Sequence, residues 1–162
     1  MKRGIKMANE ANKKAGETIL TSETRQVWLD HNMFIIWKPE YILGIPIIDD
    51  QHRGITTTIN SLYFGTQNNF IKNILRPIVD TMESYTNIHF QTEEMFHEMI
   101  AFPEAEEHKK LHRELSSKLN KVGHNSLLNN DPHEFMDFLK KWWINHICNE
   151  DLIYRDFFQK NK

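Results

Sequence analysis

The nine residues HFQTEEMFH, His89 to His97, place two histidines and one glutamate at intervals of four. On an α-helix this spacing stacks His89, Glu93 and His97 along one face. A packed apolar face avoids imidazole and carboxylate groups. The pattern therefore leaves two interpretations, an ordinary polar surface or a helix face that holds a metal ion.

The bulk composition bounds the class of protein. The chain has 162 residues, of which 40% are hydrophobic, and this suits a single domain with a packed core. Its 20 basic and 22 acidic side chains leave a net charge of −2, so we expect neither nucleic acid nor an anionic membrane as a partner. The longest apolar runs are too short to span a bilayer.

The cysteine count and the N-terminus indicate where the protein works. Cys148 is the only cysteine, which excludes an internal disulfide and favours a reducing compartment. Lys2, Arg3 and Lys6 are not followed by an apolar core, so no secretion signal is expected. We therefore expect a cytoplasmic protein.

The chain divides into two parts by character. Residues 1–36 are polar with a thin apolar set, and we expect an appended arm or short helix that could bind a protein partner. Residues 37–162 are expected to form the main domain. The stretch MFIIWKPEYILGIPII, residues 33–48, is expected to be mostly extended because it is rich in β-branched residues and holds Pro39 and Pro46.

Four helical patterns follow, at about residues 49–64, 70–100, 104–122 and 131–158. Asp49 or Asp50 is a suitable N-cap for the first pattern, and Gly65 and Gly123 are expected to end the first and third. Pro77 predicts a kink or a later start in the second, and Asp131-Pro132 opens the fourth. Helices joined by short loops pack as antiparallel neighbours, so we predict an all-α, up-down-up-down four-helix bundle with an N-terminal extension.

Seven side chains with metal-binding chemistry fall at a similar height in this bundle, toward one end. They are His52, His89, Glu93, His108, His112, His146 and Asp151. A lone HxxxH pair on a polar helix is usually solvated surface, and His52 alone would suit a cap region. The convergence of all four helices on one level favours a metal site instead.

The donor set indicates two ions rather than one. Structural zinc takes four ligands, usually with thiolates, and a single cysteine cannot supply them. Two ions bridged by both carboxylates and an oxo or hydroxo group use every donor. One ion then has six ligands and the other has five and an open position. Mixed imidazole and carboxylate suits iron, although zinc, manganese or cobalt could occupy the site in a preparation.

Four segments carry a resemblance to a known family. WKPEYILGIPIIDDQH, HFQTEEMF, HKKLH and WWINHICNEDLIY resemble, in order and spacing, the ligand segments of the hemerythrin family, with its bacterial branch nearest. The resemblance covers about residues 37–158. It implies two iron ions with an oxo or hydroxo bridge. By the same resemblance His108, His112 and His146 bind the saturated iron, His52 and His89 bind the open iron, and Glu93 and Asp151 bridge them.

Three residues near the expected site raise separate questions. His97 shares the face of Glu93 but lies outside the family's ligand set, and it either supports a ligand, gates the pocket or reaches water. Trp142 and Trp143 precede His146 by four and three residues, so both are expected to lean toward the site. The family usually has tryptophan and then leucine there, and Trp143 either narrows the oxygen pocket or is plain core packing.

The spacing of the last two ligands makes a structural prediction. His146 and Asp151 are five residues apart, about 140° around an ideal α-helix. A π-type turn between them would bring both to one centre. We therefore expect such a turn within Asn145–Asp151.

The resemblance implies reversible dioxygen binding for transport, storage or sensing rather than catalysis. Nitric oxide and small anions such as azide are further candidate ligands, and weak oxidase or peroxidase activity is compatible with such a site. Two alternatives remain open: a di-iron enzyme with peroxidase, oxidase or nitric-oxide-reducing activity, and a helical interaction module in which the metal is only structural.

Overall fold

The computed structural model describes residues 33–68 and 70–161. The expected arm, residues 1–36, lies outside the described residues except for 33–36. Within the described ranges, none of the helices combines the length and the hydropathy needed to cross a bilayer.

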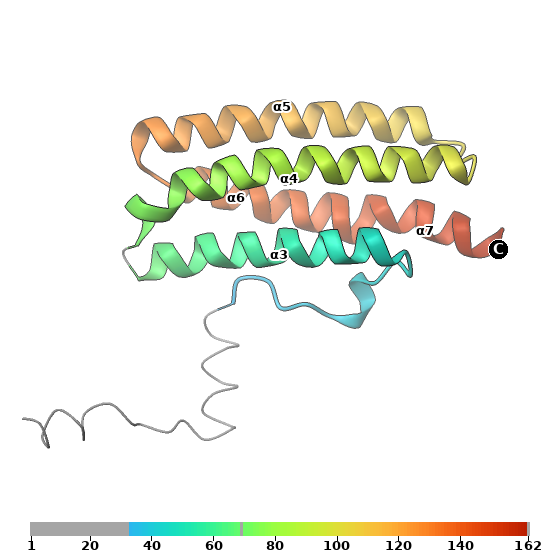
Figure 1. Cartoon of the computed structure of the whole chain (residues 1–162), viewed down its shortest axis with the longest axis horizontal. Coiled ribbons are helices and arrows are strands. Elements are labelled where there is room, and N and C mark those ends of the chain that lie inside the picture. The colour runs from blue at the N-terminus through green and yellow to red at the C-terminus, as the bar shows by residue number, and fades with distance from the viewer. Residues whose placement is uncertain (1–32, 69, 162) are drawn as a thin grey trace, which may run out of the picture. The chain divides into compact units, whose positions relative to one another are not determined.

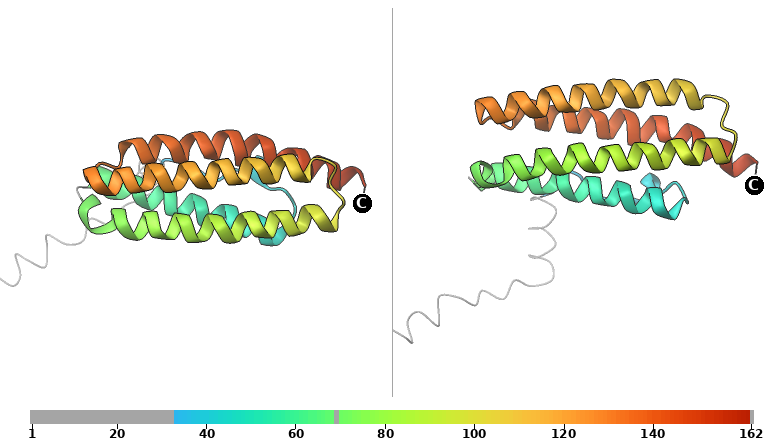
Figure 2. Two further views of the ribbon diagram at one scale, coloured as in Figure 1. Left: turned by 90° about the horizontal axis from the view of Figure 1, so that it is seen from above. Right: turned by 45° about the horizontal axis from the view of Figure 1, so that its top comes forward.

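Four antiparallel rods form the main domain (Figure 1). The first three are α3 (Pro46–Gln67), α4 (Ile71–Met99) and α5 (Ala105–Asn129). The fourth is continuous but has three parts: α6 (His133–Trp142), the π-helix η2 (Trp143–Glu150) and α7 (Asp151–Lys160). Each rod packs on the next, and α6 also packs on α3, so the rods close into a ring around one core. Figure 2 shows the same four rods from two further directions. The predicted all-α, up-down-up-down four-helix bundle is confirmed.

Two predicted helix ends are wrong, and both involve glycine. Helix α3 continues past Gly65 to Gln67, and α5 continues past Gly123 to Asn129. A Cβ atom at Gly123 would come within 2.9 Å of Val79 Cγ1, and one at Gly65 within 2.9 Å of Ile74 Cγ1. The glycines therefore allow two helices to approach closely, and they do not end a helix.

The first helix starts earlier than predicted, whereas the second starts about where it was predicted. Helix α3 begins at Pro46, three residues before the expected cap, because proline suits the first helical position. Helix α4 begins at Ile71 and runs through Pro77, so the alternative of a later start is wrong. The fourth rod begins at His133 with Pro132 as its N-cap, one residue later than expected, and the Asp131 carboxylate accepts the His133 N–H at 3.0 Å.

The segment before α3 contains one short 3₁₀ helix, η1 (Pro39–Tyr41), and is held against the bundle by two side chains. Asn60 on α3 accepts the N–H groups of Phe34 and Ile35 at 2.9 and 2.8 Å, and it donates to the Ile35 carbonyl. Asp49 accepts the three N–H groups of residues 43–45 at 2.7 to 3.1 Å. This segment is therefore fixed to α3 at two points, Asn60 and Asp49.

Two apolar clusters divide the core along the bundle. The larger includes Ile59, Leu62 and Leu139, and the smaller includes Leu43, Ile48 and Tyr154. Along α3, the level between Ile48 and Ile55 is occupied by polar residues that are nevertheless buried. Burying polar groups is costly unless they are paired or bind a ligand, so this level is where a functional site is expected.

Candidate metal centre

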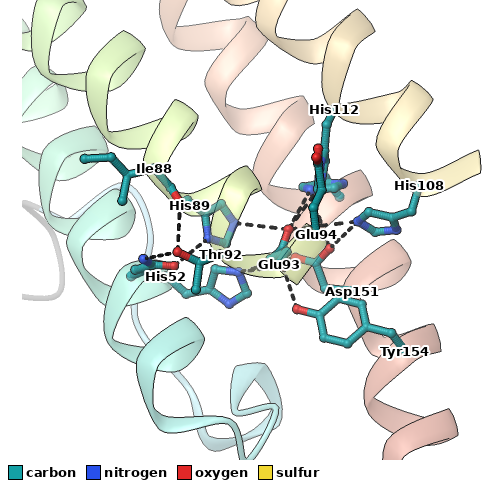
Figure 3. Close-up of polar contacts among 12 residues, drawn as sticks. His52, Ile88, His89, Thr92, Glu93, Glu94, His108, His112, Asp151 and Tyr154 are labelled. Atoms are coloured by element: carbon teal, nitrogen blue, oxygen red, sulfur yellow. Dashed lines mark hydrogen bonds and ion pairs between the residues drawn. The ribbon is translucent and has the colours of Figure 1, made fainter. Parts of the chain in front are cut away.

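All seven predicted side chains converge on one buried centre. Figure 3 shows this centre, with each of them except His146 labelled. Each rod contributes at least one of them, and none exposes more than 7% of its surface. They are His52 on α3, His89 and Glu93 on α4, His108 and His112 on α5, His146 on η2 and Asp151 on α7. Five imidazoles and two carboxylates therefore cluster with almost no exposure to bulk solvent.

Within this centre the described residues form two groups of four donors. One group is Glu93 with His108, His112 and His146, and the other is Glu93 with His52, His89 and Asp151. In each group the donor atoms lie within 4.8 Å of one another. Because Glu93 belongs to both, the two groups adjoin each other. We call them the three-histidine group and the two-histidine group.

Asp151 also faces both groups, although it is counted in only one. Its Oδ2 lies 3.3 Å from His52 Nε2, whereas its Oδ1 lies 3.5 Å from the Nε2 atoms of His108 and His146. A carboxylate whose two oxygens point to different donor sets is suited to bridge two cations.

The donor atoms themselves test whether metal ions fit here. Among the described residues, several buried atoms of the cluster have no hydrogen-bond partner. They are the Nε2 atoms of all five histidines, the Nδ1 atoms of His52 and His146, Oε2 of Glu93 and both carboxylate oxygens of Asp151. Buried polar atoms are normally hydrogen-bonded, and those that are not call for a ligand or ion. Imidazole nitrogen and carboxylate oxygen are ligands for first-row transition metals, so the residues fit such ions.

A chain of hydrogen bonds determines the tautomer of His89. The Thr92 hydroxyl donates to the Ile88 carbonyl at 2.8 Å, so its oxygen accepts the Gln51 amide N–H at 3.0 Å. This orientation turns Gln51 Oε1 toward His89 Nδ1, 3.2 Å away, and that nitrogen must carry the proton. The lone pair of His89 Nε2 therefore faces the centre. Burial lowers the pKa of His89 to about 3, which keeps this imidazole neutral.

His112 is oriented in a similar way by a charged partner. Its Nδ1 lies 3.1 Å from Oε1 of Glu94, which as a carboxylate can only accept a proton. The other oxygen of Glu94 lies 3.2 Å from Lys109 Nζ. His112 Nε2 consequently faces the centre, 3.1 Å from Glu93 Oε2.

The two carboxylates are held ionised. Burial raises the pKa of Glu93, but the nearby imidazoles of His89, His112 and His146 outweigh it and hold the pKa well below its usual range. Burial and Glu93 likewise raise the pKa of Asp151, yet His146 and further imidazoles bring it down to about 2. Both groups are therefore anionic near neutral pH and available to a cation.

Tyr154 supports the shared carboxylate from α7. Its hydroxyl donates to Glu93 Oε1 at 2.5 Å, and both side chains are fully buried. Burial and the nearby carboxylates raise the pKa of Tyr154 well above its usual value, so the phenol remains a donor. Glu93 is thus positioned by a charge-assisted hydrogen bond in addition to its histidine neighbours.

The predicted π-type turn is confirmed, and it is longer than expected. The π-helix η2 spans Trp143–Glu150 and so begins two residues before the expected range. The wider turn brings His146 Nε2 within 3.5 Å of Asp151 Oδ1, although the two residues are five apart in sequence. The wider turn therefore lets the fourth rod direct both His146 and Asp151 toward the centre.

The three further candidate residues have different surroundings. His97 is only 1% exposed, and its ring lies 4.8 Å from that of His108 and 4.5 Å from that of Tyr154, so the interpretation that it reaches water is wrong. Trp142 lies stacked over His146 at 6.4 Å, as expected for a residue that leans toward the site. Trp143 instead packs edge-on against Trp37 and Tyr41, at 6.0 and 5.6 Å. Its surroundings are those of the core-packing alternative.

Sequence reasoning missed the residues that support the donors. Gln51 and Glu94 directly adjoin the predicted ligands His52 and Glu93, but each contacts a histidine on another helix. Adjacency in sequence therefore gave no indication of their roles. Tyr154 did carry a signal, because it follows Asp151 by three residues and so shares its helix face.

The fold and the centre together define a class, the four-helix bundles with a histidine- and carboxylate-rich metal-binding core. Comparison with known proteins refines this class. The family model described as Hemerythrin HHE cation binding domain matches residues 43–157, which is more than half of the chain. The chain belongs to the hemerythrin family.

Curated relatives are consistent with this assignment. The chain is 28% identical to a bacteriohemerythrin of Stenotrophomonas maltophilia over 123 residues, covering 75% of this chain and 80% of the relative. It is 29% identical to one of Pseudomonas aeruginosa over 126 residues, with the same coverage. A bacteriohemerythrin of Clostridium acetobutylicum is 28% identical over 127 residues, covering 75% of this chain and 98% of the relative.

Proposed function

We propose that the buried centre holds a pair of iron ions and reversibly binds dioxygen. The observation that carries this proposal is the unequal pair of donor groups around the shared Glu93. His108, His112 and His146 would hold one ion, His52 and His89 the other, and Glu93 and Asp151 would bridge them. An iron pair joined by an oxo or hydroxo bridge supplies reversible electron transfer to dioxygen at the position with fewer protein ligands.

The donor chemistry supports binding rather than turnover. Oxidising di-iron sites in ferritin-like bundles use more glutamate and fewer histidine ligands. Anionic oxygen donors stabilise higher oxidation states, whereas neutral imidazoles favour the lower one. Five imidazoles against two carboxylates therefore favour release of the ligand unchanged.

The surroundings support the same conclusion, because the centre is walled by apolar and aromatic groups. The Phe90 ring stacks on His112 at 3.9 Å and also lies 5.4 Å from the His146 ring. On the opposite side, the smaller apolar cluster packs around Tyr154. The Tyr154 hydroxyl is engaged with Glu93, so it is not free to protonate a bound ligand. Apolar and aromatic walls that keep bulk water from the centre disfavour irreversible reduction of a bound gas.

The test combines metal analysis with absorption spectra recorded while oxygen is admitted and removed. The purified full-length protein is loaded with Fe(II) without air, and its iron content is expected to be two per chain. Admission of oxygen is expected to produce a visible absorption band that disappears under argon and returns on readmission. Azide and nitric oxide, as alternative small ligands, are expected to change the same spectrum.

Two matched histidine variants on α5 provide the control. His108→Ala removes a proposed ligand and is expected to abolish the band, whereas His124→Ala changes an exposed residue and is expected to leave it intact. Rapid oxidation that argon cannot reverse would support the enzyme alternative. Binding of iron with no response to gases would support a purely structural metal.

A further inference from the structure

The partners of two histidines differ in charge between the two donor groups. In the two-histidine group, His89 Nδ1 donates to the neutral amide oxygen of Gln51 at 3.2 Å. In the three-histidine group, His112 Nδ1 donates to the carboxylate of Glu94 at 3.1 Å. The geometry is otherwise alike, since each bond leaves Nε2 facing the centre.

This difference has a direct consequence for a metal ion. A hydrogen bond from Nδ1–H to an anion shifts electron density onto the ring, which makes Nε2 a stronger donor. A neutral amide has the same orienting effect with a smaller electronic effect. The three-histidine group therefore has one more imidazole than the two-histidine group. In addition, its His112 is a more basic donor than His89.

Glu94 is well placed to act as a charged partner. Its side chain is only 21% exposed, so its charge is less screened than that of a surface carboxylate. Lys109 Nζ contacts the oxygen that does not face His112, and Lys109 itself is 41% exposed. This contact holds the carboxylate in place from the solvent side.

We propose that Glu94 is a positioning residue whose negative charge gives the three-histidine group the higher affinity, so that this group binds metal first. The inference rests on the proposed function, because it requires that both groups bind metal. It adds the order in which the two groups bind their metal ions, and it assigns that order to Glu94, a side chain outside the ligand set.

The experiment is a Co²⁺ titration of the metal-free, full-length protein, followed by visible absorption and calorimetry. The wild-type chain is expected to bind two equivalents in two steps of different affinity. Glu94→Gln keeps an oxygen acceptor for His112 and removes the charge. It is expected to lower the affinity of the first step ten- to a hundredfold and that of the second step less than threefold.

A matched variant and a second measurement separate charge from structure. Glu83→Gln makes the same change on the same helix, roughly 16 Å away along its axis, and is expected to bind Co²⁺ as the wild type does. In the iron-loaded protein, Glu94→Gln is expected to raise the reduction potential, because an anion near the metal stabilises its oxidised form. Urea unfolding checks that the variant folds normally.

The outcomes distinguish this inference from the proposed function. Two Co²⁺ ions bound with equal affinity, or Glu94→Gln within threefold of the wild type at the first step, would overturn the role of Glu94 and leave the metal pair in place. A wild-type chain that binds no Co²⁺ would overturn both.

Discussion

Asp49 is expected to contribute more to stability than any comparable surface charge, although it lies outside the donor set. Its carboxylate is 7% exposed and accepts the N–H groups of Leu43, Gly44 and Ile45 at 2.7, 3.0 and 3.1 Å. Leu43 and Ile45 are themselves buried. Gly44 has a φ of +79°, which lets the chain turn around the carboxylate.

The magnitude follows from these three bonds. In Asp49→Ala the three N–H groups lose their acceptor, and each donor left unpaired in a buried place costs roughly 1–3 kcal/mol. Water can reach the partly buried Gly44 N–H, so the unpaired N–H groups of Leu43 and Ile45 account for most of the cost. The free energy of unfolding is expected to fall by about 3 kcal/mol. For a domain of this size, that loss lowers Tm by about 10 °C.

Urea unfolding of the metal-free protein measures this loss directly, with Asp50→Ala as the matched control. Asp50 is the next residue and is exposed, so its removal is expected to change the free energy of unfolding by less than ~0.5 kcal/mol. Asp49→Asn keeps one oxygen acceptor and is expected to fall between the two. Equal stability of the Asp49→Ala and Asp50→Ala proteins would refute the reasoning.

Three further predictions concern packing and metal. Gly123→Ala is expected to destabilise the protein by about 1–2 kcal/mol in urea unfolding. The added methyl group overpacks against buried Val79, and this cost outweighs a gain of about 1 kcal/mol in helix propensity. A more stable variant would contradict the close approach of α4 and α5. Ile59→Ala, at a fully buried position of the larger apolar cluster, is expected to lose roughly 3 kcal/mol. It should still bind two Co²⁺, and a changed stoichiometry would mean that the cluster and the centre are coupled. Removal of metal by a chelator is expected to lower Tm. An ion at a free concentration of 100 times its Kd stabilises the fold by about 2.7 kcal/mol. An unchanged Tm would argue against metal in the folded centre.

The pattern of helices and donors could be predicted from the sequence because it depends on local geometry. Apolar residues at helical intervals indicated four rods, and short connections made them antiparallel. The five-residue spacing of His146 and Asp151 predicted the π-type turn that η2 contains. Each of these signals lies within one segment of chain.

The predictions that failed depended on what a neighbouring helix presents. A glycine in sequence is equally compatible with a helix end and with a close helix contact, and only Val79 opposite Gly123 decides between them. Trp142 and Trp143 are adjacent, yet one stacks on His146 and the other packs on Tyr41. The rotation of the fourth rod about its own axis determines which indole faces the centre.

The sequence by itself therefore determined the four rods and the chemical types of their donors. The tertiary structure decided the pairing of donors into two groups, the burial of His97 and the partners of His89 and His112. The physical reason is the range of the interactions involved. Helix periodicity acts over a few residues, whereas a hydrogen bond such as that from His112 to Glu94 depends on the register of two helices that pack side by side.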